Sequence, residues 1–193
     1  MSTAEDPTPK NTRLHREDWL AHALETLRCE GISGLRVEPL ARSLGVTNGS
    51  FYWHFKDRRD LLQSVLAHWM ELMTDAIEER RLVSGGPKER LARLLRDITV
   101  EERNRYDLAV RNWATFDEMA HSAVRKVDEG RLSFCMELFL GLGFTLEEAE
   151  VRSRMLMFYQ VGEVGFSIPD SLEKRLEYVD QRIRILAEHC DQV

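Results

Sequence analysis

A run of polar and aromatic side chains in the first third of this 193-residue chain has the chemistry to contact nucleic acid. Asn48 and Ser50 carry amide and hydroxyl groups that can hydrogen-bond base edges, and Gly49 between them lets the backbone come close. Side chains that can donate to phosphate oxygens stand beside them at Thr47, Tyr52 and His54. These residues can read DNA only if one exposed, rigid element presents them together.

The surrounding sequence predicts such an element. A helix predicted over about 37–44 has Pro39 in its first turn, where the missing N–H has no partner to lose, and Gly45 ends the helix as a left-handed cap. Thr47 is predicted to cap a short third helix by accepting from the N–H of Ser50. Two short helices joined by a glycine turn are the layout of a helix-turn-helix, whose second helix enters the DNA major groove.

The segment Leu40 to Leu62, which reads LA-x-x-LGV-x-x-x-x-FYWHF-x-x-R-x-x-LL, resembles the TetR (tetracycline repressor) family of transcriptional regulators. The resemblance is close over about the first 80 residues and only architectural beyond them. It implies that Asn48 and Ser50 read bases and that Tyr52 anchors a phosphate. Carried over position by position, the implied DNA contacts are Arg36, Val37, Thr47, Asn48, Gly49, Ser50, Tyr52, Trp53, His54 and Arg58.

Several positions depart from the family pattern or allow two interpretations. Arg36 stands where the family usually has a capping Thr or Ser; it can reach a phosphate but cannot cap a helix. Glu38 would face a polyanion, so we expect it either to accept from a cytosine or to pair with a neighbouring Arg. Phe51 and Phe55 are predicted to be core residues, whereas Trp53 could either contact DNA or pack on the first helix.

The charge of the chain is compatible with a DNA-binding head. The whole chain has 27 basic and 33 acidic residues, a net charge of -6, but residues 1–60 hold nine of each. The acidic surplus therefore lies beyond residue 60, and a DNA contact face needs only local phosphate neutralisation. Three isolated cysteines, no secretory signal and no apolar run long enough to span a membrane indicate a reducing, cytoplasmic setting.

Helical periodicity runs through most of the remaining sequence and predicts an all-α fold of about nine helices. The first helix is predicted over 16–30, and a long helix starts near Asp57. A Thr145-x-x-Glu148 capping box opens a later helix, and the last helix is predicted to begin at Asp170. We expect a disordered arm over 1–13, a helix-turn-helix DNA-binding domain over 14–60 and a helical ligand-binding and dimerisation domain over 61–193.

The second domain is rich in aromatic and methionine side chains, which could line an apolar cavity for a small effector or simply fill the core. A small, largely apolar ligand is what the family resemblance implies there, and neither a cofactor nor a metal is expected. The candidate pocket residues are His68, Met73, Arg111, Trp113, Phe116, Met155, Phe158 and Tyr159.

Two C-terminal segments predict a homodimer. The segment 155–166 is apolar on nearly every side, which predicts burial all round, and the last helix carries a seam spaced like that of a helix–helix contact. Such a seam can also pack within one chain. The candidate interface residues are Met155, Gly162, Phe166, Leu172, Leu176, Val179, Ile183 and Leu186.

The expected function is a ligand-responsive regulator, a repressor that binds a palindromic double-stranded operator as a dimer and is released by a small molecule. An all-α enzyme is disfavoured because the sequence has no HExxH, P-loop or GxSxG motif and no i, i+4 histidine pair. Non-specific architectural DNA binding and transcriptional activation are the alternatives that stay open.

Overall fold

The computed structural model describes residues 14–100, 105–165 and 170–188, so the arm expected over 1–13 lies outside the described residues. Within these ranges the protein has nine α-helices and no strand, and a short 3-10 helix follows the first α-helix. In chain order they are α1 (Arg16–Glu30), η1 (Ile32–Gly34), α2 (Val37–Ser43), α3 (Asn48–Tyr52), α4 (Arg58–Arg81), α5 (Pro87–Val100), α6 (Asp107–Ala114), α7 (Glu118–Gly141), α8 (Leu146–Gly165) and α9 (Leu172–Ala187).

Local signals begin and end most helices where the sequence predicts. α1 has the predicted bounds, and its last turn closes through the N–H of Gly31 on the carbonyl of Leu27. The Asp57 carboxylate caps α4 by accepting from the N–H of Asp60 at 2.9 Å. The capping box before α8 is confirmed as well, because the N–H of Thr145 donates to Glu148 at 2.9 Å.

Two details of the predicted helix ends are wrong. The Thr47 side chain does not cap α3 as predicted. The N–H of Ser50 donates to the carbonyl of Thr47 at 3.0 Å instead of to its hydroxyl. The last helix begins at Leu172 rather than Asp170, because the Ser171 hydroxyl takes the capping position and accepts from the N–H of Lys174.

The buried side chains form two clusters that meet along the two longest helices. The first cluster contains side chains from α1, α2 and α3, from the first half of α4, from α6 and from the first half of α7. The second joins the end of α4 with α5, the second half of α7, α8 and α9. The core of the head therefore continues into α6 and α7, and the boundary placed at residue 60 stays a prediction.

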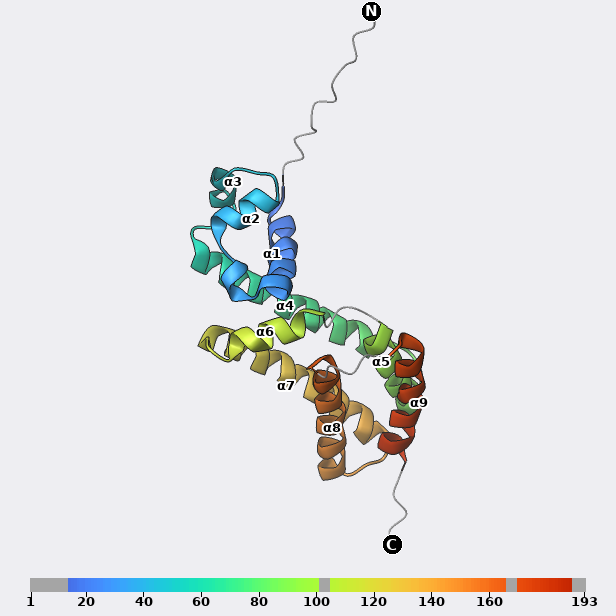
Figure 1. The fold of residues 1–193 in the computed structure, drawn as a ribbon. Helices are drawn as coiled ribbons and strands as arrows, with labels where there is room; N and C mark the ends of the chain where they lie inside the picture. The colour runs from blue at the N-terminus through green and yellow to red at the C-terminus, as the bar shows by residue number, and fades with distance from the viewer. Residues whose placement is uncertain (1–13, 101–104, 166–169, 189–193) are drawn as a thin grey trace, which may run out of the picture.

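Figure 1 shows α2 and α3 at the opposite end of the molecule from α8 and α9. We call α1 to α3 the head and α5 to α9 the body. α4 has 24 residues, a length of about 36 Å at 1.5 Å per residue, and it runs from the head into the body. One continuous helix thus joins the segment with the DNA-binding chemistry to the part of the molecule that holds the second core.

Candidate DNA interface and ligand pocket

Aromatic packing holds the short helix α3 in place. Phe51 and Phe55 are fully buried, as predicted, and both rings meet the buried Trp19 ring of α1 edge to face, with centroids 5.7 and 6.4 Å away. Edge-to-face aromatic pairs add about 0.5–1.5 kcal/mol beyond the area they bury. A helix of five residues has little stability of its own, so this packing is what keeps α3 helical.

The turn between α2 and α3 depends on a glycine. Gly45 has φ +70°, in the left-handed region that disfavours other residues, as the sequence predicts. The chain then folds back, and the N–H of Val46 donates to the carbonyl of Ala41 at 2.9 Å. This turn sets the angle at which α3 projects beyond α2.

The recognition segment presents its polar and aromatic residues to solvent. Thr47, Asn48 and Gly49 are exposed, and Ser50 is half-buried. Tyr52 is 62% exposed and Trp53 is 83% exposed, so Trp53 does not pack on the first helix. His54 is half-buried and tilts against the Trp19 ring at 6.4 Å. The exposed residues share one end of the head, which is the arrangement that direct base reading requires.

The flanking residues divide into exposed and structural ones. Arg36 is exposed and does not cap α2, as predicted, whereas Val37 is half-buried and packs on the head core. Glu38 pairs with Arg42 one turn later at 2.5 Å, so its charge is neutralised within α2. Arg58 donates from Nε to the carbonyl of Leu35 at 2.6 Å, so part of its guanidinium supports the loop before α2.

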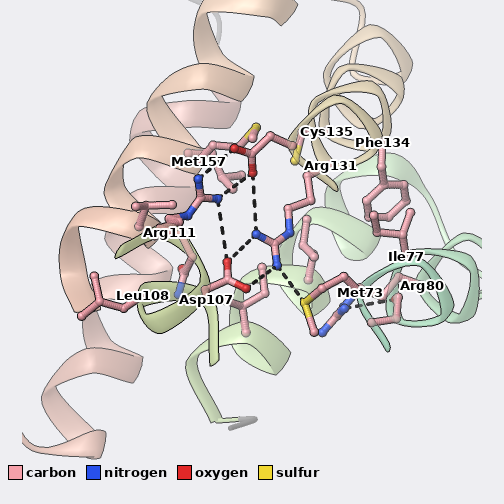
Figure 2. Close-up of a pocket in the computed structure, with 17 residues that line it drawn as sticks. Met73, Ile77, Arg80, Asp107, Leu108, Arg111, Arg131, Phe134, Cys135 and Met157 are labelled. Atoms are coloured by element: carbon pink, nitrogen blue, oxygen red, sulfur yellow. Dashed lines mark hydrogen bonds and ion pairs between the residues drawn. The ribbon is translucent and has the colours of Figure 1, made fainter. Parts of the chain in front are cut away.

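A cavity of about 80 Å³ lies in the body, between α4, α5, α6, α7 and α8. Figure 2 shows Asp107 and Arg111 on one side of it and Ile77 and Phe134 on the other. Most of the wall is apolar. The lining residues are Met73, Ala76, Ile77, Arg80, Leu94, Ile98, Asp107, Leu108, Arg111, Asp128, Arg131, Phe134, Cys135, Leu156, Met157, Gln160 and Val161.

Of the candidate pocket residues, Met73 and Arg111 line the cavity and the others do not. Trp113 is buried in the first core cluster, whereas Phe116 is 94% exposed in the turn after α6. His68 is half-buried on α4 and does not reach the cavity wall.

Three further candidate pocket residues lie on the side of α8 that faces away from the cavity. Met155, Phe158 and Tyr159 are exposed, because α8 turns Leu156, Met157, Gln160 and Val161 toward the cavity instead. Both sides of this helix are apolar, so its periodicity could not tell them apart. The expected burial of this segment on all sides is therefore wrong for the single chain.

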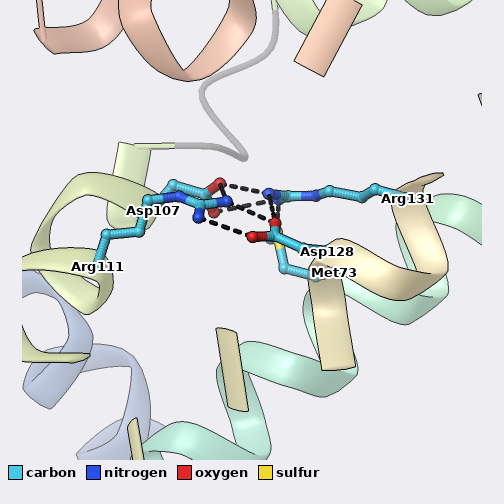
Figure 3. Close-up of polar contacts among 5 residues, drawn as sticks. All are labelled: Met73, Asp107, Arg111, Asp128 and Arg131. Carbon is cyan, nitrogen blue, oxygen red and sulfur yellow. Dashed lines mark hydrogen bonds and ion pairs between the residues drawn. The ribbon is translucent and has the colours of Figure 1, made fainter. Parts of the chain in front are cut away.

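Four charged side chains form a closed ring on the polar side of the cavity (Figure 3). Arg111 binds Asp128 with two hydrogen bonds of 2.8 and 2.6 Å, and Arg131 binds Asp107 with two of 2.5 and 3.1 Å. The crossed pairs lie at 3.8 and 3.9 Å. Arg131 also donates to the sulfur of Met73 at 2.9 Å, which brings α4 into contact with the pairs between α6 and α7.

The surroundings of two ionisable groups in the cavity wall shift their pKa values. The hydrogen bonds to Asp128 raise the pKa of Arg111. Partial burial acts in the opposite direction, because it favours the neutral form, but its effect is smaller. Burial raises the pKa of the Cys135 thiol to about 12, although Arg131 works in the opposite direction. Arg111 is therefore charged and Cys135 is a neutral thiol near pH 7.

Asp107, Asp128 and Arg131 are the members of this ring that sequence reasoning missed. Asp107 and Arg111 are one turn apart on α6, and Asp128 and Arg131 are one turn apart on α7, a spacing visible in the sequence. Such pairs are common on exposed helix faces, so the spacing alone does not place them at a cavity.

The candidate dimer residues have two different environments. Val179, Ile183 and Leu186 are buried in the second core cluster, where α9 packs against α5, and their expected role at a dimer interface stays a prediction. Met155 is 52% exposed, Leu172 is also exposed, and Gly162 and Leu176 are half-buried. Phe166 lies outside the described residues.

The described ranges lack a membrane-spanning helix and a metal-binding cluster. No helix there is long and apolar enough to cross a membrane. No group of three His, Cys, Asp or Glu side chains in the same ranges is placed to hold a metal ion.

The sequence of the head matches known regulators. Residues 20–65 match the family model "Bacterial regulatory proteins, tetR family". The transcriptional regulator AcrR of Shigella flexneri is 28% identical over 160 residues, which cover 77% of this chain and 70% of AcrR. The class D tetracycline repressor of Escherichia coli is 43% identical over 53 residues, which cover 28% of this chain and about a quarter (24%) of the repressor.

Solved structures extend the likeness to the body. A transcriptional regulator from Saccharomonospora viridis, solved in complex with choline, has a TM-score of 0.74 at 17% identity, and the match covers 88% of this chain and 95% of that one. A regulator from Rhodococcus sp. Rha1 has a TM-score of 0.72 at 20% identity, over 90% and 94% of the two chains. At such identities these structures show a shared fold.

Three findings point to the same class of protein, a transcriptional regulator. They are the helix-turn-helix with its glycine turn, the family match over the head and the fold shared with solved regulators. Residues 20–65 thus form a DNA-binding domain of the TetR family, and the relatives of the chain indicate a transcriptional regulator rather than an enzyme.

Proposed function

We propose that this regulator is a repressor that binds a palindromic operator as a dimer and is released when a small molecule enters the body. The observation that carries the proposal is the path of α4. Its first turn follows the recognition segment directly, and Met73, Ala76 and Ile77 on its second half line the cavity. A molecule that displaces this half of α4 would also move the head, because the helix is continuous.

In this proposal the head over 14–60 contacts DNA, and the body over 61–193 binds the effector and dimerises. Asn48 and Ser50 read bases, Tyr52 and Arg36 bind phosphates, and Trp53 covers a phosphate or a thymine methyl. The exposure of Asn48, Tyr52 and Trp53 supports these roles. Such a protein would act in the compartment that holds its DNA.

The release step requires an effector that prefers the conformation unable to bind DNA. Two recognition helices on one dimer must sit about 34–36 Å apart to enter successive major grooves, so a small change in their separation weakens both contacts. The solved choline complex of the structural relative supports a body that holds small molecules in this fold.

Selection of bound sequences from a random DNA pool tests the operator. We expect an inverted repeat with half-sites one helical turn apart. Uniform, salt-sensitive binding without a repeat would instead indicate architectural DNA binding. A reporter gene placed behind the selected sequence then separates repression from activation.

Fluorescence anisotropy on that operator tests the contact residues. Asn48→Ala and Trp53→Ala should each weaken binding by about 1–3 kcal/mol, the range for a lost base contact. Phe116→Ala is the matched control, because Phe116 is an equally exposed aromatic residue on the body. If Asn48→Ala and Trp53→Ala bind like the control, α3 is not the recognition helix.

A further inference from the structure

On the side of the cavity formed by α6 and α8, two buried polar atoms of lining residues lack a hydrogen-bond partner among the residues described. One is the Nε of Arg111, a donor, and the other is the Oε1 of Gln160, an acceptor. A buried polar group without a partner costs about 1–3 kcal/mol, so a molecule that satisfies both atoms gains stability from each. A hydroxyl or an amide can do so, because such a group donates and accepts at once.

The four charged side chains of the ring already bind one another, and Arg80, the other charged residue of the wall, donates to the carbonyl of Ala76 at 3.1 Å. Both oxygens of Asp107 and both oxygens of Asp128 accept from a guanidinium, and the two Nη atoms of Arg111 donate to Asp128. At the ring, a cationic molecule would have to displace an arginine from a carboxylate, and an anionic molecule would have to displace a carboxylate from an arginine. Breaking a partly buried, two-bond ion pair is costly, because it leaves one charge without its partner.

The aromatic content of the wall also disfavours a quaternary ammonium group. Phe134 is the single aromatic ring among the described lining residues. The guanidiniums of Arg81 and Arg90 already lie over that ring, at 5.8 and 6.0 Å from its centroid. Cages for methylated ammonium groups use several open aromatic faces, which this cavity does not offer.

From these observations we propose that the effector is an uncharged, mainly apolar small molecule with one amide or hydroxyl group, which binds between Arg111 and Gln160. The inference rests on the proposed function, since it takes the cavity as the effector site. The remaining wall suits an aliphatic chain, and the flexible side chains of Met73 and Met157 can adapt to its shape. The cavity of about 80 Å³ sets a small size for the part that is enclosed.

Calorimetric titration of the full chain with three matched series tests the proposal. The probes are the amides from butanamide to octanamide, the carboxylates of the same lengths and the alkylamines of the same lengths. We expect the best amide to bind at least about tenfold more tightly than the best carboxylate or amine, a difference that about 1.4 kcal/mol supplies. A carboxylate or an amine that binds as tightly as the best amide overturns the proposal, and so does the absence of binding in all three series.

A variant locates the binding group. Gln160→Met keeps the length of the side chain and removes its polar atoms, so it should weaken amide binding about fivefold, the effect of one neutral hydrogen bond. Gln181→Met is the matched control, because Gln181 is exposed on α9. If Gln160→Met and the control bind the amide equally well, Gln160 is not the binding group. Circular dichroism shows that each variant is folded.

The same probes separate this inference from the proposed function. An amide that binds but leaves the operator complex intact supports the ligand class and contradicts release by a small molecule. Conversely, operator release by a carboxylate or an amine, without an effect of the amides, contradicts the ligand class and supports release.

Discussion

Arg58 shows how a residue outside the recognition helix can support it. It is the first residue of α4, and its Nε and Nη2 atoms donate to the carbonyls of Leu35 and Ile32 at 2.6 and 3.2 Å. These carbonyls belong to the connection that leads into α2. The guanidinium therefore ties the start of α4 to the segment that orients the helix-turn-helix.

Replacing Arg58 with Met keeps most of the apolar stem and removes both donors. We expect the free energy of unfolding to fall by about 1–3 kcal/mol, because carbonyls bonded to a charged group lose their partners. Thermal unfolding measures this, with Arg59→Met as the control, since Arg59 is exposed on the same turn. Unchanged stability together with weaker, less salt-dependent DNA binding would mean that Arg58 is only a phosphate contact.

Cys135 is a second residue whose behaviour follows from its surroundings. Burial raises its pKa from 9.0 to about 12, whereas Cys29 is exposed. Because thiolates rather than thiols react with disulfide reagents, we expect Cys29 to react at pH 8 and Cys135 to react only after unfolding. Ellman's reagent measures this in a Cys190→Ser background. Rapid reaction of two thiols in the folded protein would contradict the burial of Cys135.

The same pKa shift has a consequence for stability. The folded chain holds the Cys135 proton more tightly than the unfolded chain, so this contribution is complete below about pH 9 and is lost as the pH rises toward about 12. The slope is about 1.4 kcal/mol per pH unit in that window. Comparison with Cys135→Ala by denaturant titration isolates it, because the variant lacks the titrating group.

At the scale of elements, the ring of Asp107, Arg111, Asp128 and Arg131 joins α6 to α7. Each pair has one member on each helix, and Arg131 reaches Met73 of α4 as well. α6 also packs against α1 in the head. A change at the polar side of the cavity can therefore reach the head through α6 as well as through α4.

A double-mutant cycle on Arg111 and Asp128 tests this connection. We expect Arg111→Leu and Asp128→Leu each to destabilise the protein, and the double variant to lose less than the sum, with a coupling energy of about 1–3 kcal/mol. The exposed pair Glu150 and Arg154 on α8, at 2.7 Å, is the control and should couple by about 0.3–0.5 kcal/mol. Equal coupling in the two pairs would show that the ring contributes no more than a surface salt bridge.

At the scale of the whole molecule, the outer side of α8 lacks a partner in the single chain. Val151, Met155 and Phe158 are exposed there, and Ile185 of α9 lies beside Val151 and Met155 along a shallow groove. Exposed apolar patches of this kind mark interaction sites in soluble proteins. A two-fold arrangement would cover the patch with its own copy, as the proposed dimer requires.

Glutamate placed in this patch should separate the dimer. We expect Met155→Glu combined with Phe158→Glu to give a monomer by light scattering coupled to size exclusion, and to weaken operator binding, which needs both half-sites. Phe116→Glu is the control, because its side chain is 94% exposed in the turn after α6 rather than on α8 or α9. A variant that stays dimeric would place the interface on another surface.

The parts of this protein that its sequence determines are local ones. The conformation of Gly45, the Asp57 cap and the burial of Phe51 and Phe55 follow from backbone sterics and from apolar spacing within a few residues. Together they place a helix-turn-helix in the first third of the chain, which is why the family could be recognised there.

Contacts between residues far apart in the chain were decided only by the tertiary structure. The ring at the cavity joins α6 to α7 through Arg111 and Asp128, which are 17 positions apart, and no spacing rule connects them. Likewise, both sides of α8 are apolar, so only the packing of α4, α6 and α7 decides that Leu156 and Gln160 face the cavity while Phe158 faces solvent. Hydrophobic periodicity identifies an apolar face but not the partner that covers it, because that partner comes from elsewhere in the chain or from a second copy.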